Sequence, residues 1–141
     1  MTVLITIDSL LENHQWWSQL LLLYAGEGAP FEIHCWNDET ELIHLAEQHG
    51  FKARNTIPDV TIITGKVTQE WVDLLITGKK PESTSGYNKM TPFYIVRIGE
   101  KFSSEQYGTS LLLSCDTAEE SNVIDKVINA ISCHANIYRN A

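Results

Sequence analysis

The first 51 residues of this 141-residue chain contain no Lys or Arg, so all ten basic residues lie further along the chain. From Lys52 onward ten acidic residues balance them, and the whole net charge of −8 therefore belongs to the first third. A surface of that sign repels phosphate, which argues against nucleic-acid binding through this part. The acidic stretch either aids solubility or attracts a basic partner.

Long apolar runs and targeting signals are also missing. The longest apolar run, residues 20–25, is far shorter than the roughly 20 residues that a membrane-spanning helix needs. The N-terminus, MTVLITIDSL, lacks the basic segment of a signal peptide and alternates like a strand. Cys35, Cys115 and Cys133 lack metal-type spacing and suit a reducing compartment. We therefore expect a cytoplasmic protein without membrane contact.

Motifs of common catalytic and cofactor sites are absent. Residues 64–68, TGKVT, lack the earlier glycine and the following hydroxyl of a phosphate-binding loop, and neither GxGxxG nor GxSxG occurs. Four of the five histidines lie in the acidic third: His14, His34, His44 and His49. His44 and His49 fall on different helix faces, so we interpret these histidines as surface or core-edge residues. The sequence predicts a non-enzymatic protein with neither cofactor nor metal.

Hydrophobic periodicity predicts a single α/β domain over residues 1–141, in the order βαβαβαββα. The β-branched run at 60–63 leads directly into a helix that Thr68 is predicted to cap and Gly78 to end, an arrangement typical of half a crossover unit. Similar units flank it. The other expected strands are 2–7, 31–36, 93–98 and 111–115. The sheet should be mixed, with parallel crossovers first and an antiparallel hairpin of the last two strands.

Helix boundaries follow from capping patterns. Ser9 with Glu12, Asp38 with Glu41 and Thr117 with Glu120 have the spacing of capping boxes, and Gly50 has the C′ position of the second helix. Asp8 and Asn37 are alternative caps for the first two helices. Residues 79–90 are polar and contain Pro, Ser and Gly, so we expect a mobile loop there. The tail, 134–141, is expected to fray.

The predicted order resembles the thioredoxin-like fold. Thr91-Pro92 is similar to the cis-proline segment of that family, and Cys35 lies near the position of its reactive cysteine. The family's CxxC motif is absent, because Asp38 stands where the second cysteine would be. The resemblance implies a monothiol redox role for Cys35. The alternative is a small buried cysteine without chemistry, since nearby Asp38 and Glu39 oppose a lowered thiol pKa.

Two tryptophans are candidates for a binding surface. Trp36 lies on the polar side of its strand, and Trp16 is expected to lie away from the main apolar stripe of the first helix. An aromatic ring supplies contact area, and flanking carboxylates orient a basic partner. Packing against neighbouring helices is the alternative for each tryptophan. The candidate partner-binding residues are Asp38, Glu39, Glu41, Trp36, Glu32, Glu12, Glu47 and Trp16.

In size, charge and lack of a catalytic motif, the chain resembles bacterial immunity proteins by type, without a shared motif. That resemblance implies a protein-binding module that neutralises a basic toxin, for example a nuclease, by docking the acidic surface of residues 1–51. One alternative is the redox protein using Cys35. Another is an acidic secretion chaperone or adaptor that dimerises. The sequence leaves open the oligomeric state and whether Leu20, Leu22 and Leu23 are core or interface.

Overall fold

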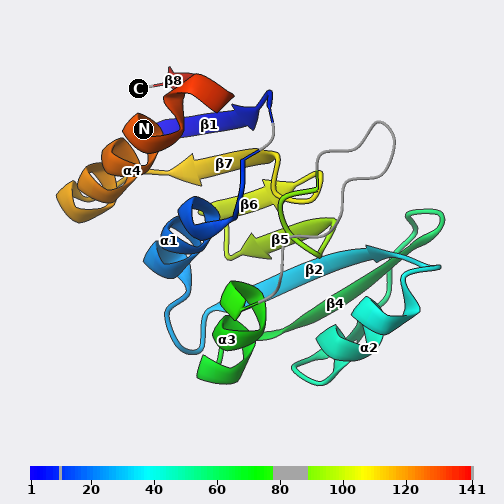
Figure 1. Cartoon of the computed structure of the whole chain (residues 1–141). Helices are drawn as coiled ribbons and strands as arrows, with labels where there is room; N and C mark the ends of the chain where they lie inside the picture. Colours follow the sequence, from blue (N-terminus) through cyan, green and yellow to red (C-terminus); the bar gives the residue numbers. More distant parts are fainter. Residues whose placement is uncertain (10, 78–88, 141) are drawn as a thin grey trace.

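The computed structural model describes residues 1–9, 11–77 and 89–140 (Figure 1). In order, the described elements are β1 (Thr2–Ile7), α1 (Gln15–Tyr24), β2 (Pro30–Trp36), α2 (Thr40–Glu47), β3 (Phe51–Ala53), β4 (Val60–Lys66), α3 (Gln69–Thr77), β5 (Ile95–Ile98), β6 (Phe102–Glu105), β7 (Ser110–Ser114), α4 (Ala118–Ile131), a 3-10 turn (Ser132–His134) and β8 (Ala135–Asn140). Most of the predicted mobile loop, up to residue 88, lies outside the described residues.

All strands belong to one sheet, in the order β3-β4-β2-β5-β6-β7-β1-β8, and every described pair is antiparallel. The α/β class is confirmed, but the predicted parallel crossovers are wrong. Neighbouring strands alternate in direction, and each helical connection joins two strands that lie an even number of positions apart in the sheet order. The two strands of each connection therefore run in the same direction. Other strands separate them: β2 separates β4 from β5, and β1 separates β7 from β8.

The helices gather on one face of the sheet (Figure 1). The connections through α1 and α2 lead to strands that lie nearer to β3 in the sheet order. Those through α3 and α4 start from strands that run in the opposite direction, and they lead toward β8. A common handedness therefore places all four helices on the same side. The core lies between them and the inward side chains of the strands, among them Val3, Ile33 and Leu111. We call this side the helical face and the other side the open face.

Three strands were missed by the sequence analysis. The polar segment Phe102–Glu105, expected to be part of a connection, forms β6 and separates the two strands of the predicted hairpin. The tail expected to fray forms β8, which pairs with β1 along six residues. β3 is only three residues long. Short or polar strands are stabilised mainly by the strands they pair with. Their own sequences therefore need show little hydrophobic alternation.

Two of the predicted helix caps are wrong and two are confirmed. Thr117 caps α4 through a complete capping box, and the Thr68 hydroxyl accepts a hydrogen bond from the backbone N–H of Trp71. The Ser9 hydroxyl instead bonds Nδ1 of His134 at 2.8 Å, and α1 begins only at Gln15. α2 begins at Thr40, and the residue before it, Glu39, turns its side chain away from the helix.

Candidate functional site

The open face has one row of side chains that crosses all eight strands in register. From β3 to β8 the row contains Phe51, Thr64, Glu32, Arg97, Ser103, Leu112, Leu4 and Tyr138. Its two ends are apolar and exposed, with Phe51 at 71% and Tyr138 at 62% exposure. Its centre is polar.

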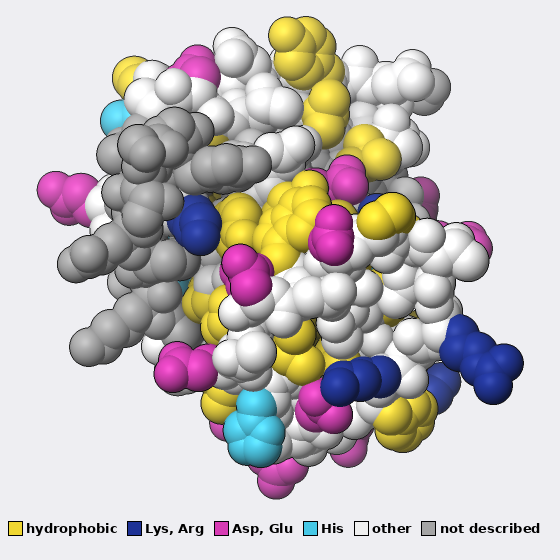
Figure 2. All heavy atoms as spheres, turned by 90° about the vertical axis from the view of Figure 1, so that its right-hand side faces the viewer, with side chains coloured by type: hydrophobic (Ala, Val, Ile, Leu, Met, Phe, Trp, Pro, Cys, Tyr) yellow, Lys and Arg dark blue, Asp and Glu magenta, His cyan; other side chains and the backbone are white. Residues whose placement is uncertain are grey.

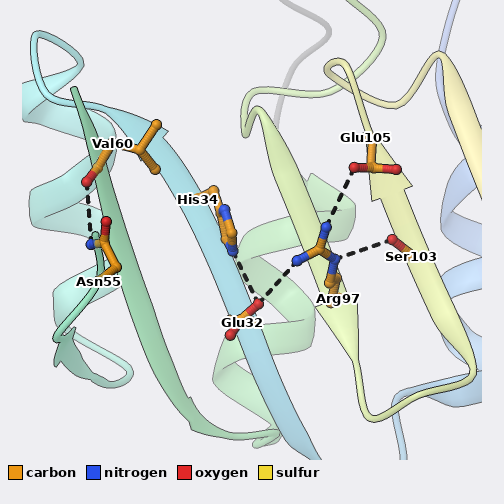
Figure 3. A network of polar contacts seen from close by, with 7 residues as sticks. All are labelled: Glu32, His34, Asn55, Val60, Arg97, Ser103 and Glu105. Carbon is orange, nitrogen blue, oxygen red and sulfur yellow. Dashed lines mark hydrogen bonds and ion pairs between the residues drawn. The ribbon is translucent and has the colours of Figure 1, made fainter. Parts of the chain in front are cut away.

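An ion-pair network occupies the centre of the row (Figure 3). The Arg97 guanidinium lies 3.3 Å from a Glu32 carboxylate oxygen and 3.4 Å from one of Glu105, and its Nε donates to the Ser103 hydroxyl at 3.3 Å. Nε2 of the buried His34 lies 3.0 Å from the same Glu32 oxygen. Burial by itself would raise the pKa of Glu32, but the contacts with His34 and Arg97 outweigh it and lower the pKa. The charge of Glu32 is therefore compensated within the molecule.

Beside this network lies a cluster of aromatic rings. The ring of Trp36 lies 4.8 Å from that of Tyr94, which meets Tyr107 edge-on at 5.3 Å between centroids. The Tyr107 hydroxyl donates to a carboxylate oxygen of Glu39 at 3.0 Å. Nζ of Lys89 lies 4.4 Å from the centroid of the Tyr107 ring, a cation–π contact. A basic side chain of the protein thus already covers one ring of this cluster.

Carboxylates surround Trp36 where β2 ends. Trp36, Asn37, Asp38 and Asp59 line a hollow of about 330 Å³, and none of the residues that the structure describes along it is basic. Glu39 accepts a hydrogen bond of 2.8 Å from the backbone N–H of Trp36, and exposed Glu41 lies in the first turn of α2. We call Asp38, Glu39, Glu41 and Asp59 the acidic rim. Figure 2 shows hydrophobic side chains exposed between carboxylates on this side of the molecule.

The other predicted binding residues lie elsewhere. Glu47 faces Lys52 at 3.6 Å, so its charge is partly compensated. Glu12 and Trp16 line a different hollow, of about 500 Å³, between the start of α1 and the end of α4. Trp16 is only 6% exposed, so the prediction that it lies away from the core is wrong. α1 packs against α3 and α4 as well as the sheet, which buries both Trp16 and Trp17.

The leucines of α1 divide between core and surface. Leu20 is fully buried and Leu23 is partly buried against the core, whereas Leu22 is 54% exposed. Because a single leucine of this group faces solvent, the helix offers little spare apolar surface.

Several residues of the site were missed by the sequence analysis. Tyr94, Arg97, Glu105 and Tyr107 reach it through the pairing of β5 with β2 and β6, which no local pattern indicates. Asp59 carried a local signal, because it follows Pro58 at the entry to β4. Its φ of 64° belongs to a tight turn, a conformation that Asp tolerates better than most residues.

Cys35 does not have the surroundings of a reactive thiol. It is fully buried, and burial together with the nearby charge of Glu39 raises the pKa of its thiol to about 12. The described residues contain no cis peptide bond, so the bond before Pro92 is trans. The crossover topology behind the thioredoxin-like resemblance is not the one observed. Within the same residues, no three His, Cys, Asp or Glu side chains are grouped to hold a metal ion.

We expect the three thiols to react very unequally with iodoacetamide. Exposed Cys133 should be alkylated within minutes at pH 8, whereas buried Cys35 and Cys115 should react only after urea unfolds the protein. Mass spectrometry of timed samples measures this order. Rapid alkylation of Cys35 in the folded protein would contradict its burial and reopen a redox role.

None of the described helices is long and apolar enough to cross a membrane. Comparison with protein-family models, with curated proteins and with solved structures found no match for this chain, so the evidence on its function comes from the open face and the acidic rim themselves.

Proposed function

We propose that this protein is a non-enzymatic binding module that holds a basic protein partner against the acidic rim. A partner of the expected kind is a bacterial toxin with a positively charged substrate groove, which the immunity-type module would cover and neutralise. The observation that carries the proposal is the hollow around Trp36, which carboxylates border and which, within residues 1–9, 11–77 and 89–140, no basic residue lines. A half-buried ring between carboxylates is a suitable receptor for Lys or Arg side chains.

Lys89 illustrates the chemistry within the molecule. Its ammonium lies over the Tyr107 ring, and the hydroxyl of that ring donates to Glu39 of the acidic rim. A partner's Lys or Arg would find the same combination of ring and carboxylate at Trp36. Long-range attraction from the first third of the chain, which has no basic residue, would also accelerate the encounter.

The carboxylates of the rim differ in role. Glu39 accepts hydrogen bonds from the Trp36 backbone and from Tyr107, so replacing it would disturb the site itself. Asp38 and Glu41 are exposed and have no ion-pair partner among the described residues. The double substitution Asp38→Lys with Glu41→Lys therefore tests binding while keeping the local structure.

We expect this double variant to lose its partner. The protein is immobilised and exposed to lysate of its source organism, and a rising salt gradient elutes bound proteins for identification. The wild type should retain a basic protein in stoichiometric amount. For that purified protein, the rim variant should show an association rate at least about tenfold lower, with a weaker dependence on salt.

A matched control separates a docking site from general charge attraction. Glu27→Lys with Glu119→Lys changes the net charge by the same amount at exposed positions outside the rim. It should keep most of the association rate of the wild type. Equal losses in the two double variants, or retention unaffected by the rim variant, would refute docking at the acidic rim.

The two alternatives have less support. Redox chemistry requires an accessible thiolate, and Cys35 is buried with a raised pKa. A chaperone that dimerises through α1 requires an apolar face there, and among its leucines only Leu22 is well exposed.

A further inference from the structure

A larger hollow lies at the end of the sheet where β4 and β5 end and where β2 and β3 begin. Its volume is about 710 Å³. Two cross-strand rows border it, one of Phe51, Thr64, Glu32 and Arg97, the other of Lys66, Pro30 and Gly99. The surface of the sheet is hollowed here because the side chains of Thr64 and Pro30 are short and Gly99 has none. The longer side chains of Phe51, Lys66 and Arg97 form its walls.

Two phenylalanines line the hollow from opposite faces of the sheet. Phe31 is fixed: it stacks on Trp71 at 4.7 Å and covers Gly65, where a Cβ atom would come within 2.8 Å of the ring. Phe51 instead stands free at 71% exposure. An aromatic side chain that solvent surrounds on an edge strand is a stacking surface for a planar molecule.

The charges around the hollow are partly compensated. Glu32 and Arg97 pair with each other, whereas Lys66 and Glu100 have no ion-pair partner among the described residues. His49 lines the hollow too. Thr68, the cap of α3, is also part of the wall, and the N-terminus of this nine-residue helix favours negative charge. Lys66 is therefore free to bind an anion, and Glu100 opposes one.

We propose that this hollow binds a planar aromatic small molecule that bears one negatively charged group. The ring stacks on Phe51, and the anionic group lies beside Lys66 and the Thr68 hydroxyl. The volume falls in the range of small-molecule sites in proteins. Among the described residues, this site shares no lining residue with the hollow at the acidic rim, so the two proposals are tested independently.

The first test compares two fluorescent probes with the same ring systems. 8-Anilinonaphthalene-1-sulfonate carries a sulfonate, and N-phenyl-1-naphthylamine lacks it. We expect the sulfonate to bind with one-to-one stoichiometry and to be about three- to fivefold tighter than the uncharged probe, the effect of one partly exposed ion pair. Raising the salt concentration should remove that difference.

Three substitutions then locate the site. Lys66→Met, which keeps the apolar stem, should weaken binding of the sulfonate up to about fivefold and leave the uncharged probe unchanged. Glu100→Gln should strengthen sulfonate binding about twofold, because it removes a like charge. Phe51→Ser should weaken both probes about fivefold, as expected for the loss of a stacking surface.

Controls exist at matched positions. Lys126 is exposed on α4 without an ion-pair partner among the described residues, and Tyr138 is an exposed ring at the far end of the same row. Lys126→Met and Tyr138→Ser should bind both probes like the wild type. Circular dichroism verifies that each variant is folded. The absence of saturable binding, or binding that Lys66→Met and Phe51→Ser leave unchanged, would overturn the proposal.

Discussion

Trp17→Ala should lower the free energy of unfolding by about 3–5 kcal/mol, the range for removal of a fully buried large aromatic side chain. Trp17 is 0% exposed and joins α1 to the middle of the sheet. Its ring meets Phe102 edge-on at 6.0 Å, and its indole N–H donates to the Ser104 hydroxyl at 2.9 Å. Urea unfolding followed by circular dichroism measures the loss.

Smaller substitutions separate packing from the hydrogen bond. Ser104→Ala leaves the indole N–H of Trp17 buried without an acceptor, so it should cost about 1–3 kcal/mol. In a Trp17→Phe background the same change should cost little, because no N–H then needs an acceptor. Additive losses in this double-mutant cycle would show that the hydrogen bond contributes nothing.

Trp71 supplies a control of equal burial. It is also 0% exposed, but its indole N–H has no hydrogen-bond partner among the described residues. Trp71→Phe should therefore cost less than Trp17→Phe, because no hydrogen bond is lost. The reverse order would contradict the role assigned to Ser104.

Local patterns were sufficient to predict which way the side chains of β2 point. Trp36 lies with Glu32 and His34 on the open face, the polar side predicted for it, whereas Phe31, Ile33 and Cys35 face the helices. This succeeded because the period of a strand depends only on the strand itself. The Thr117 capping box was equally local and is confirmed.

Strand order could not be predicted in the same way. The sequence placed α3 correctly between two strands, but nothing within residues 60–98 indicates that β2 lies between β4 and β5. That arrangement depends on pairings between segments far apart in the chain. The same reason explains why the segment of β8 was predicted to fray. It is a strand because it pairs with β1, and its own sequence does not indicate that pairing.

The residues of the candidate site that are near neighbours in sequence could be predicted, and those from distant segments could not. Trp36, Asp38 and Glu39 are near neighbours in sequence, and the structure places them together around the end of β2. Their partners Tyr94 and Tyr107 come from segments more distant in the chain, so these two tyrosines had no sequence signal. Trp16 was misjudged because helical periodicity does not show how many neighbours a helix packs against.

Gly50→Ala should also destabilise the protein, by about 1–3 kcal/mol, the usual cost of overpacking. The place of this glycine after the second helix predicts a C′ position, where glycine is favoured because it adopts a left-handed backbone. Gly50 is not among the described glycines with positive φ. It is required for another reason: a Cβ atom there would collide with the carbonyl oxygen of Thr64 and lie 2.9 Å from its carbon. These are backbone atoms of β4, so they cannot move aside as a side chain would.

We expect the collision to be relieved by movement of β3 away from β4. This strand has only three residue pairs with β4, so it can separate while the rest of the sheet persists. Thermal unfolding measures the stability, and hydrogen exchange at residues 51–53 measures the separation. Gly26→Ala is the matched control, since no atom lies within 4 Å of its Cβ position and its φ is not positive; it should be neutral or slightly stabilising. Equal stability of the two variants would contradict the close approach at Gly50. Because Phe51 moves with β3, Gly50→Ala should also weaken binding of both naphthyl probes, while association at the acidic rim is retained.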